Sequence, residues 1–391
     1  MIDFLSEAQD LFEYTQALRR DFHRHPELGF HEVRTAGIVA RELNQLGLEV
    51  SSGIAETGVV AMIEGNRPGP VALLRFDMDA LPIEEQTGAS YASQNPGVMH
   101  ACGHDGHTAV GLTVARLLHS HRHEFPGAIK LVFQPAEEGV GGAERMLAEG
   151  ILENPHADAA LALHLWNEKP FGWLGITNGP IMAAAEIFHI RVTGSGGHGA
   201  VPNLTIDPVL ASTQIINALQ GIVARNVSPL ETAVVSVTSM HAGEAFNVIP
   251  AQASLEGTIR TFSPEVRQRV LTRFQQVVEG VGTAMECQVD CQVQSISPAV
   301  VNDNDLAEKV RATAQRLLPD SQIGSDYRTM GAEDMAFILQ ELPGCFFFIG
   351  AANPAEGLDA PHHHPRFDFD ERALVQAAAL MAGAALDYLQ T

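Results

Sequence analysis

The residues of this sequence that are best suited to chemistry are a cluster of histidines around one cysteine and a later pair of glutamates. They stand in His100-Ala-Cys-Gly-His-Asp-Gly-His-Thr108 and in Gln134-Pro-Ala-Glu-Glu-Gly139. Thiolate, imidazole and carboxylate groups are the usual protein ligands of zinc and related divalent ions. Gly103 separates Cys102 from His104 and allows a sharp backbone turn, so that both side chains can face one ion. The cluster therefore predicts the site of a metal-dependent hydrolase.

The glutamate pair supplies two different functions that such a hydrolase needs. Neighbouring side chains on an extended segment point in different directions, so Glu138 can bind metal while Glu137 faces the substrate. A bound ion lowers the pKa of water, and the free carboxylate takes the proton and delivers it to the leaving amine. Adjacent glutamates are also common on solvated surfaces, but these two follow an apolar strand and a Pro-Ala turn.

Further histidines are candidates for the same site. His164 closes an apolar run and is either a ligand or a buried core histidine. One residue of the run His362-His363-His364 could complete the site, and spacing alone does not say which. His100 and His107 are more typical of loop hydrogen-bonding groups than of ligands. Metal-bound imidazoles need oriented neighbours, and we expect Asp79 and Asp105 to orient those rings.

A second group of polar residues lies later in the chain. His198 stands in Gly194-Ser-Gly-Gly-His-Gly199, a glycine-rich loop that is either a simple turn or a mobile donor to a substrate oxygen. Asn247 and Arg260 follow in Phe246-Asn-Val-Ile-Pro250 and Gly257-Thr-Ile-Arg260. A guanidinium there would suit a substrate carboxylate, with a structural salt bridge as the alternative.

The elements that must position these groups alternate between strands and helices. We expect helices over 6–22, 33–46 and 112–118, and strands over 59–63, 71–75, 129–133 and 159–163. This alternation predicts a largely parallel sheet covered on both faces. Asp77, Glu137 and His164 each come where one of these strands ends, and sites in open α/β sheets lie at that edge.

From about 186 to 294 the order becomes β-α-β-β-α-β, which is typical of a ferredoxin-like domain. Its second helix has a clear start, with Ser263 as N-cap and Pro264 at the first helical position. A helix over 305–318, a strand over 345–349 and a long terminal helix follow. We therefore predict a split α/β catalytic domain, 1–182 and 295–391, interrupted by an inserted α+β domain, 183–294.

Composition narrows the classes of function. The chain has 391 residues, 47 acidic against 24 basic, and a formal net charge of −23, which argues against nucleic acid or an anionic membrane as partner. Its four cysteines form no regular disulfide framework, so we expect a reducing cytoplasm. The amino terminus lacks a basic region followed by an apolar segment, and no apolar run reaches the roughly 20 residues that span a bilayer. We therefore expect no export signal and no membrane span.

Taken together, the motifs resemble the M20 metallopeptidases, in particular the amidohydrolase branch of aminoacylases, hippurate hydrolases and auxin-conjugate hydrolases. The resemblance runs nearly end to end. Besides the two motifs above, it is carried by Asp21-Phe-His-Arg-His-Pro-Glu-Leu-Gly29, Asp77-Met-Asp-Ala-Leu-Pro82, Leu163-His-Leu-Trp166, Gly196-Gly-His-Gly-Ala-Val-Pro202, Asn247-Val-Ile-Pro250, Gly257-Thr-Ile-Arg260, Gly331-Ala-Glu-Asp334 and His363-His-Pro-Arg-Phe-Asp-Phe-Asp370.

The resemblance implies two divalent ions per subunit, often manganese or zinc, with Glu137 as general base and acid. The ligands it implies are Cys102, His104, Glu138, His164 and His363. The mixed donor set also tolerates cobalt and nickel. The inserted domain is similar to a dimerisation module whose loop sends His198 into the partner's site, which implies a homodimer and leaves a tetramer open. Many relatives have a histidine where this chain has Asn203, a difference within the pocket.

The reaction implied is hydrolysis of an N-acyl amino acid to a carboxylate and a free amino acid. Two alternatives stay open at this point. One is a dipeptidase or carboxypeptidase of the same superfamily, which would recognise a free terminus. The other is a non-catalytic metal-binding homologue.

Overall fold

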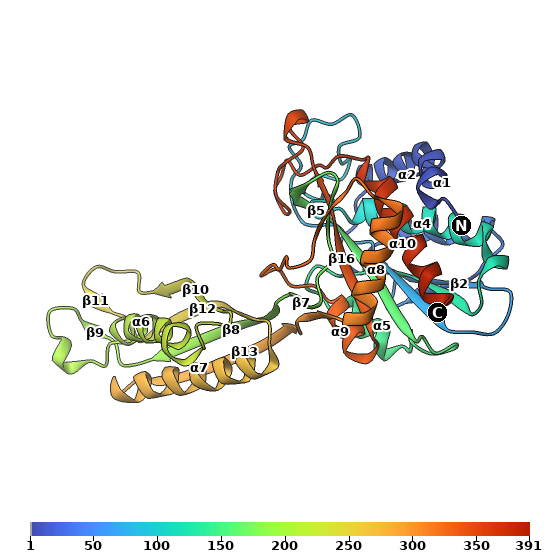
Figure 1. Ribbon diagram of the computed structural model, residues 1–391. Coiled ribbons are helices and arrows are strands. Elements are labelled where there is room, and N and C mark those ends of the chain that lie inside the picture. Colours follow the sequence, from blue (N-terminus) through green and yellow to red (C-terminus); the bar gives the residue numbers. More distant parts are fainter. Residues whose placement is uncertain (1) are drawn as a thin grey trace. The chain divides into compact units, whose positions relative to one another are not determined.

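In the computed structural model, which describes residues 2–391, the chain divides into two units (Figure 1). The larger unit contains the described residues up to Ile181 together with Val300–Arg328 and Glu333–Thr391. The smaller unit contains Met182–Ala299 and Thr329–Ala332. It ends later than the predicted 294, because strand β13 (Gln288–Ser297) continues beyond Val293.

The larger unit is built on a mixed sheet of eight strands among the described residues. In spatial order they are β1 (Glu49–Ile54), β2 (Gly58–Glu64), β4 (Ala128–Gln134), β3 (Val71–Asp77), β5 (Ala159–Pro170), β16 (Gly344–Ala352), β6 (Trp173–Gly175) and β15 (Gln322–Gly324). The central strands β4, β3, β5 and β16 run parallel to one another. Strands β3, β4 and β16 are buried along their whole length, as parallel strands covered on both faces must be. The predicted α/β class is confirmed.

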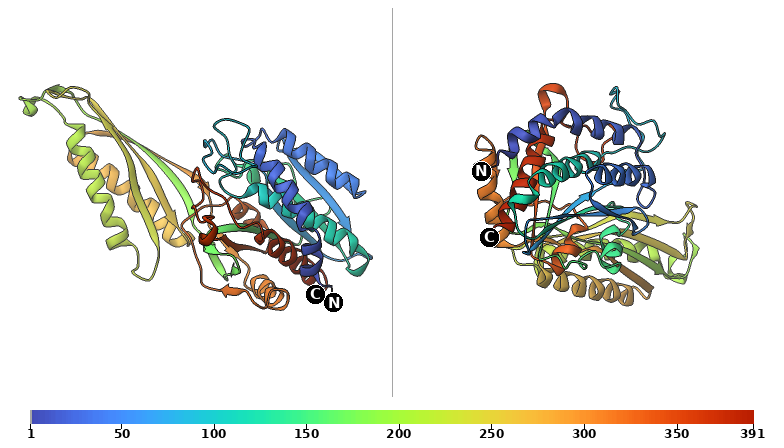
Figure 2. Two further views of the ribbon diagram at one scale, coloured as in Figure 1. Left: turned by 90° about the horizontal axis from the view of Figure 1, so that it is seen from above. Right: turned by 90° about the vertical axis from the view of Figure 1, so that its right-hand side faces the viewer.

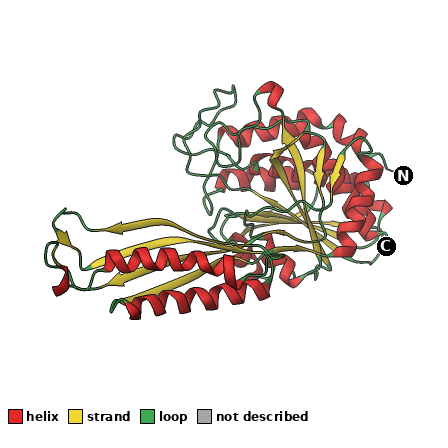
Figure 3. Cartoon of the chain, turned by 60° about the vertical axis from the view of Figure 1, so that its left-hand side comes forward, coloured by secondary structure: helices red, strands yellow, loops and turns green. Residues whose placement is uncertain are grey.

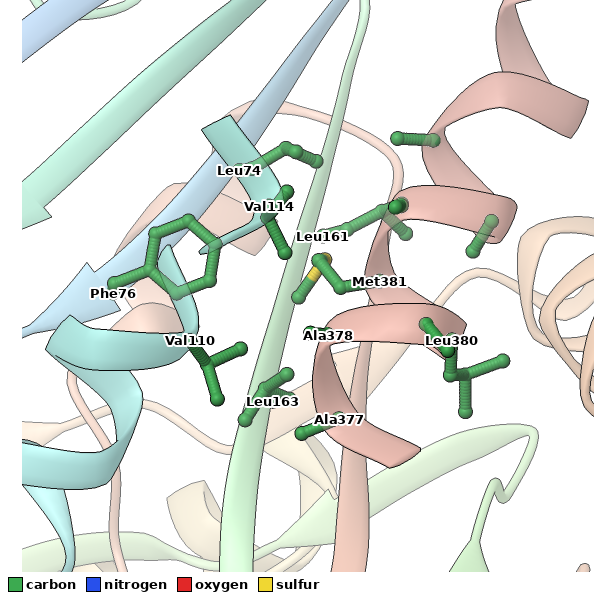
Figure 4. Packing of buried hydrophobic residues seen from close by; sticks show 14 of the residues in the cluster. Leu74, Phe76, Val110, Val114, Leu161, Leu163, Ala377, Ala378, Leu380 and Met381 are labelled. Atoms are coloured by element: carbon green, nitrogen blue, oxygen red, sulfur yellow. The ribbon is translucent and has the colours of Figure 1, made fainter. Parts of the chain in front are cut away.

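Helices of the larger unit cover this sheet. They are α1 (Phe4–Asp10), α2 (Phe12–Arg24), α3 (Val33–Gln45), α4 (His104–Ser120), α5 (Gly142–Ala148), α8 (Asn304–Leu317), α9 (Met335–Glu341) and α10 (Ala373–Leu389), with single 3₁₀ turns η1 (Arg122–Glu124) and η3 (Pro354–Glu356). Figure 4 shows Val110 and Val114 of α4 and Met381 of α10 packed against Leu74 and Leu161 of the sheet. Helix α10 is apolar nearly all round, which explains its burial in the core.

Two expectations for the larger unit need correction. The predicted helix over 6–22 is two helices, α1 and α2, which meet at Leu11. Strand β5 does not end at Leu163 but continues to Pro170, because β16 runs beside it past His164. His164 therefore lies within a strand. Helix α1 packs against α10, so both ends of the described chain lie close together (Figure 2).

The smaller unit has the predicted ferredoxin-like order. Strands β8 (Ala184–Thr193), β10 (Ala233–Ala242), β12 (Gln252–Thr261) and β13 form an antiparallel sheet in the order β10-β12-β8-β13. Helices α6 (Pro208–Asn226) and α7 (Pro264–Ala284) run along this sheet (Figure 3). Ser263 accepts a hydrogen bond from Val266 N, which confirms the predicted N-cap.

Three short elements complete the smaller unit: β9 (Gly197–His198), η2 (Pro202–Leu204) and β11 (Val248–Ile249). Where the chain passes from one unit to the other, β7 (Gly179–Met182) pairs with β14 (Val300–Asn302). All four cysteines are free thiols. Within residues 2–391, no helix is both long enough and apolar enough to cross a membrane.

Candidate metal centre

The carboxyl ends of the central strands bring the candidate ligands of the larger unit together. Strand β3 ends at Asp77, with Asp79 just beyond it, and the acid pair follows β4. Gly103 has φ +96°, a left-handed conformation that favours glycine, and it directly precedes His104 at the start of α4. The turn predicted between Cys102 and His104 is therefore present.

The predicted ligand atoms form one continuous cluster. Cys102 Sγ lies 3.4 Å from His164 Nε2, and His363 Nε2 lies 3.3 Å from Glu138 Oε1. In each of three sets the candidate atoms lie within 4.8 Å of one another: Cys102 with His104 and His164, Cys102 with Glu138 and His363, and His104 with both glutamates. The sets share members, which is the arrangement that neighbouring metal positions would need.

Two atoms of this cluster are buried and lack a hydrogen-bond partner among the described residues. They are His104 Nε2 and Glu138 Oε1, and the 3.3 Å approach of His363 Nε2 to Glu138 Oε1 is an ion-pair contact without hydrogen-bond geometry. A buried polar atom without a partner is costly, because it has lost its water and gained nothing in return. Imidazole nitrogen, carboxylate oxygen and a nearby thiol are donors that divalent metals accept, so a divalent ion fits this cluster.

The protonation of these groups also indicates a site for a divalent cation. Burial acts to lower the pKa of His104, but the carboxylates of Asp77 and Asp79 outweigh it and raise this pKa to about 10. Burial and then the charge of Glu138 raise the pKa of the Cys102 thiol well above its usual value. Protons therefore occupy groups that a cation would deprotonate on binding.

Glu137 stands beside this cluster in an acidic environment. Its Oε2 atom lies 4.0 Å from His104 Nε2. Burial, followed by the charges of Glu333 and Glu138, raises the pKa of Glu137 well above its ordinary value. A carboxyl group with a raised pKa can both accept and donate a proton near neutral pH.

The two aspartates that were expected to orient ligand rings behave differently. Asp79 does contact His104: its carbonyl oxygen lies 3.0 Å and its Oδ1 3.3 Å from His104 Nδ1. Asp105 instead accepts hydrogen bonds from Arg19 Nε at 2.8 Å and bonds to His23 Nδ1 at 2.7 Å. It thus tethers the first turn of α4 to helix α2, because its position on α4 directs it away from His104.

Three other histidines of the segments 100–108 and 362–364 bond to groups outside the candidate ligand set. His107 bonds to Asp77 Oδ1 at 2.6 Å through Nδ1 and accepts from Leu165 N at 2.9 Å, so both its nitrogens are used. His362 Nε2 lies 3.0 Å from the carbonyl oxygen of Leu165, and His364 Nδ1 accepts from Arg366 N. Of the run of three, only His363 lies against Glu138 within the described residues. His100, which was expected to be a loop hydrogen-bonding group, is buried, and neither of its ring nitrogens has a hydrogen-bond partner within the described residues. Burial lowers its pKa to about 4.

A buried ion-pair network next to Glu137 was not predicted from the sequence. Arg75 of β3 donates to Asp77 at 2.6 Å, to Glu333 at 2.8 Å and to Asp334 at 2.7 Å. Asp334 also accepts from Gln134 and from the backbone of Ala143. A charged residue inside an apolar strand and the acidic pair in Gly331-Ala-Glu-Asp334 were the available signals.

The remaining predicted residues lie in the smaller unit. His198 is exposed on β9, where its Nδ1 accepts from Ala200 N at 3.1 Å. Asn247 is exposed beside β11. Arg260 is half-buried on β12 and donates to the carbonyl oxygens of Ile259 and Glu186. His198 and Asn247 lie close together, because Val248 of β11 pairs with His198 of β9 and Gly199 N donates to the carbonyl oxygen of Asn247 at 2.8 Å. Arg260 bonds to neither of them within the described residues.

Comparison with known proteins places the chain in a family. The family model described as peptidase family M20/M25/M40 matches residues 73–387. The N-acetylcysteine deacetylase of Bacillus subtilis is 40% identical over 96% of each chain, and thermostable carboxypeptidase 2 of Saccharolobus solfataricus is 37% identical over 98% of this chain and 97% of that one.

Solved structures agree. The Bacillus subtilis YXEP protein, described as a dinuclear metal-binding peptidase from the M20 family, superposes with a TM-score of 0.85 at 36% identity, covering 98% of this chain and 99% of that one. A family model matching most of the chain, together with relatives matched over nearly their whole length, establishes the conclusion: the chain belongs to peptidase family M20/M25/M40.

Proposed function

We propose that this protein is a metal-dependent amidohydrolase that cleaves N-acyl amino acids to a carboxylate and a free amino acid. The observation that carries the proposal is the placement of Glu137, a carboxyl group with a raised pKa, beside a cluster of Cys, His and Glu donors. The name of the similar deacetylase, which acts on an N-acetyl amino acid, supports this substrate class.

The proposed site holds two divalent ions between Cys102, His104, Glu138, His164 and His363. The dinuclear description of the similar YXEP protein supports the number, and manganese or zinc are the preferred metals, with cobalt or nickel as alternatives. When bound, such ions polarise the scissile carbonyl and acidify water. Glu137 takes a proton from the attacking water and returns it to the leaving amine. Asp79 holds the ring of His104.

For the smaller unit we propose a role in dimerisation and in completing the site. His198 would donate to the developing oxyanion in the partner subunit, and Asn247 and Arg260 would bind the substrate's carboxylate. The exposure of His198 and Asn247 supports this, as does Arg260, which makes no ion pair with a carboxylate within the described residues. Exposed Leu204, Phe246 and Val248 supply apolar contact area nearby in the chain. A tetramer formed from two such dimers is also compatible with this role of the smaller unit.

The four free thiols support the cytoplasm as the working compartment, because cysteines are kept reduced there. The excess of acidic residues supports a small-molecule substrate over nucleic acid or membrane partners.

A panel of substrates tests this function. Free-amine release is measured from N-acetyl, N-benzoyl and indole-acetyl amino acids and from unblocked dipeptides, with manganese-loaded protein and a chelated control. Metal-dependent release from the acylated substrates is expected. Faster cleavage of free dipeptides would favour the peptidase alternative, which the similar thermostable carboxypeptidase supports. Silence on all substrates with metal bound would favour a non-catalytic homologue.

Mixed dimers test where His198 acts. His198→Ala and Glu137→Ala subunits are each expected to be inactive alone. When the two are mixed, the His198→Ala subunit keeps Glu137 and would receive His198 from its partner, so part of the activity should return. No recovery in a mixture shown to contain hybrid dimers would place His198 in its own subunit's site or outside the chemistry.

A further inference from the structure

The segment Asp21–Gly29 carries a distinctive motif to which the proposed function assigns no role, and Glu32 follows it. Glu32 has an exposed fraction of 0%. Its carboxylate accepts two hydrogen bonds, from Ala136 N at 2.9 Å and from Thr57 Oγ1 at 2.6 Å. It forms no ion pair within residues 2–391. A buried carboxylate without a cationic partner is destabilising by itself, so its contacts indicate a function other than stability.

The residue that Glu32 holds is the one before the acid pair. Ala136 is fully buried and has φ +56°, a left-handed conformation that costs a residue with a Cβ about 1–2 kcal/mol. Its N–H donates to Glu32, and its carbonyl oxygen accepts from Gly142 N at 3.0 Å. Both sides of this strained residue are therefore fixed from outside. Because Glu137 follows at once, the conformation of Ala136 decides where the acid pair points.

The same segment packs directly on this turn. A side chain at Gly29 would come within 3.0 Å of both Ala136 Cα and Ala136 Cβ, so only glycine allows the two backbones to approach this closely. The carboxylate of Glu27 accepts from Arg34 N at 2.9 Å and Thr35 N at 2.8 Å, which fixes the first turn of α3 and so the position of Glu32.

The segment also reaches the second acidic loop. The carbonyl oxygen of Glu27 accepts from Ala80 N at 2.8 Å, directly after Asp79. Asp79 Oδ2 in turn accepts from Glu138 N at 3.0 Å. The turn that carries the acid pair is thus held on one side by Glu32 and on the other by Asp79, and both supports rest on residues 27–32.

We propose that Glu32 is a positioning residue that, through the N–H of Ala136, holds Glu137 and Glu138 in their working orientations. This inference rests on the proposed roles of Glu137 as base and Glu138 as ligand. It predicts that loss of the Glu32 contact lowers metal affinity and kcat together and leaves KM nearly unchanged, because substrate-binding groups lie elsewhere.

Three variants of Glu32 and one control separate this role from general stability. Glu32→Ala removes the acceptor, Glu32→Asp keeps the charge but shortens the reach, and Glu32→Gln keeps an oxygen for Ala136 and can donate to Thr57. The control is Glu42→Ala, within helix α3, whose N-cap residue is Glu32. Glu42 is also buried and accepts from Tyr14 and Arg116, but contacts neither acidic loop within the described chain.

Three readouts are measured on the full chain: manganese affinity of the metal-free protein by calorimetry, kcat and KM at saturating metal, and hydrogen exchange of the peptide that contains Ala136. Glu32→Ala and Glu32→Asp are expected to lose about 10–100-fold in metal affinity and in kcat. Both should also lose exchange protection at Ala136. Glu32→Gln and Glu42→Ala should match the unmodified protein in all three.

Equal losses in Glu32→Ala and Glu42→Ala would overturn the proposal, as would unchanged metal affinity and exchange in Glu32→Ala. Should Glu32→Ala fail to fold, the contrast between Glu32→Asp and Glu32→Gln decides in its place. Failure of the proposed base is seen separately, as activity of Glu137→Ala. Even then, lost metal affinity and lost protection in the Glu32 variants would support the positioning of Glu138.

Discussion

The two units present their candidate residues in opposite ways. In the larger unit, His104 and Asp79 are buried, and Glu137 and Glu138 are nearly so, each with neighbours that set its orientation or charge. In the smaller unit, His198 is exposed and its ring contacts only the backbone of its own loop within the described residues.

The difference separates two kinds of functional residue. Burial with fixed neighbours holds a group in one geometry, whereas an exposed side chain on a short loop samples several orientations. The larger unit can therefore prepare a metal site alone. We propose that the exposed residues of the smaller unit act in the site of a partner subunit.

From this difference between the two units we expect the largest loss of activity on substitution of Glu137, in the larger unit. Glu137→Ala should lower kcat by about 10²–10⁴-fold, because general-base catalysis is lost, while bound metal per subunit stays unchanged. Substrate assays and metal analysis of the same preparation measure both. Glu144→Ala, an exposed glutamate on the neighbouring helix α5, serves as the control. An active Glu137→Ala protein would remove the base assignment.

The smaller unit is tested at His198. His198→Ala should lower kcat by about 10²–10³-fold, as expected for loss of one oxyanion donor, without changing metal affinity. His189→Ala, another exposed histidine of the same unit, should have no effect. Unchanged turnover in His198→Ala would mean that the exposed region contributes no chemistry.

A variant of Cys102 tests whether the larger unit holds the metal through this thiol. Cys102→Ala should weaken metal binding by at least about 10–100-fold. Replacing a residue that only hydrogen-bonds to a metal ligand usually costs that much affinity, so loss of a ligand itself should cost no less. Metal content after dialysis against a weak chelator measures this, beside Cys291→Ala in the smaller unit. Retention of the full metal content would take Cys102 off the ligand set.

The last prediction concerns the stability of the site's support and not its chemistry. Burial, partly offset by the bond from Thr57, raises the pKa of Glu32 from its usual 4.5 to about 7. The folded chain then binds the proton more tightly than the unfolded chain, so this group's contribution to stability falls as pH rises from about 4.5 to about 7. Glu32→Gln should remove that fall.

The expected gain of the Glu32→Gln variant over the unmodified chain is about 3 kcal/mol at neutral pH relative to acid pH. Denaturant unfolding of the metal-free proteins between these pH values measures it. A constant difference across the range would show that folding does not shift the pKa of Glu32, which would overturn this prediction.

Much of the fold followed from local pattern. The alternation of strands and helices, the ferredoxin-like order of the smaller unit and the cap at Ser263 all depend on residues close in sequence, so the pattern predicted them. The errors arose where distant segments decide. Strand β5 continues past His164 because β16 pairs with it, and Asp105 faces Arg19 because α2 packs beside α4.

The sequence by itself determined which chemistry is available, since residue types and short spacings at Cys102, His104 and the acid pair set the donors and the base. Only the tertiary structure decided which histidine of 362–364 lies against Glu138, that Arg75 pairs with Glu333, and that Glu32 holds the turn before the acid pair from far away in the chain. The physical reason is that hydrogen bonds and charge interactions act over a few ångströms in space, a distance that chain separation does not reveal.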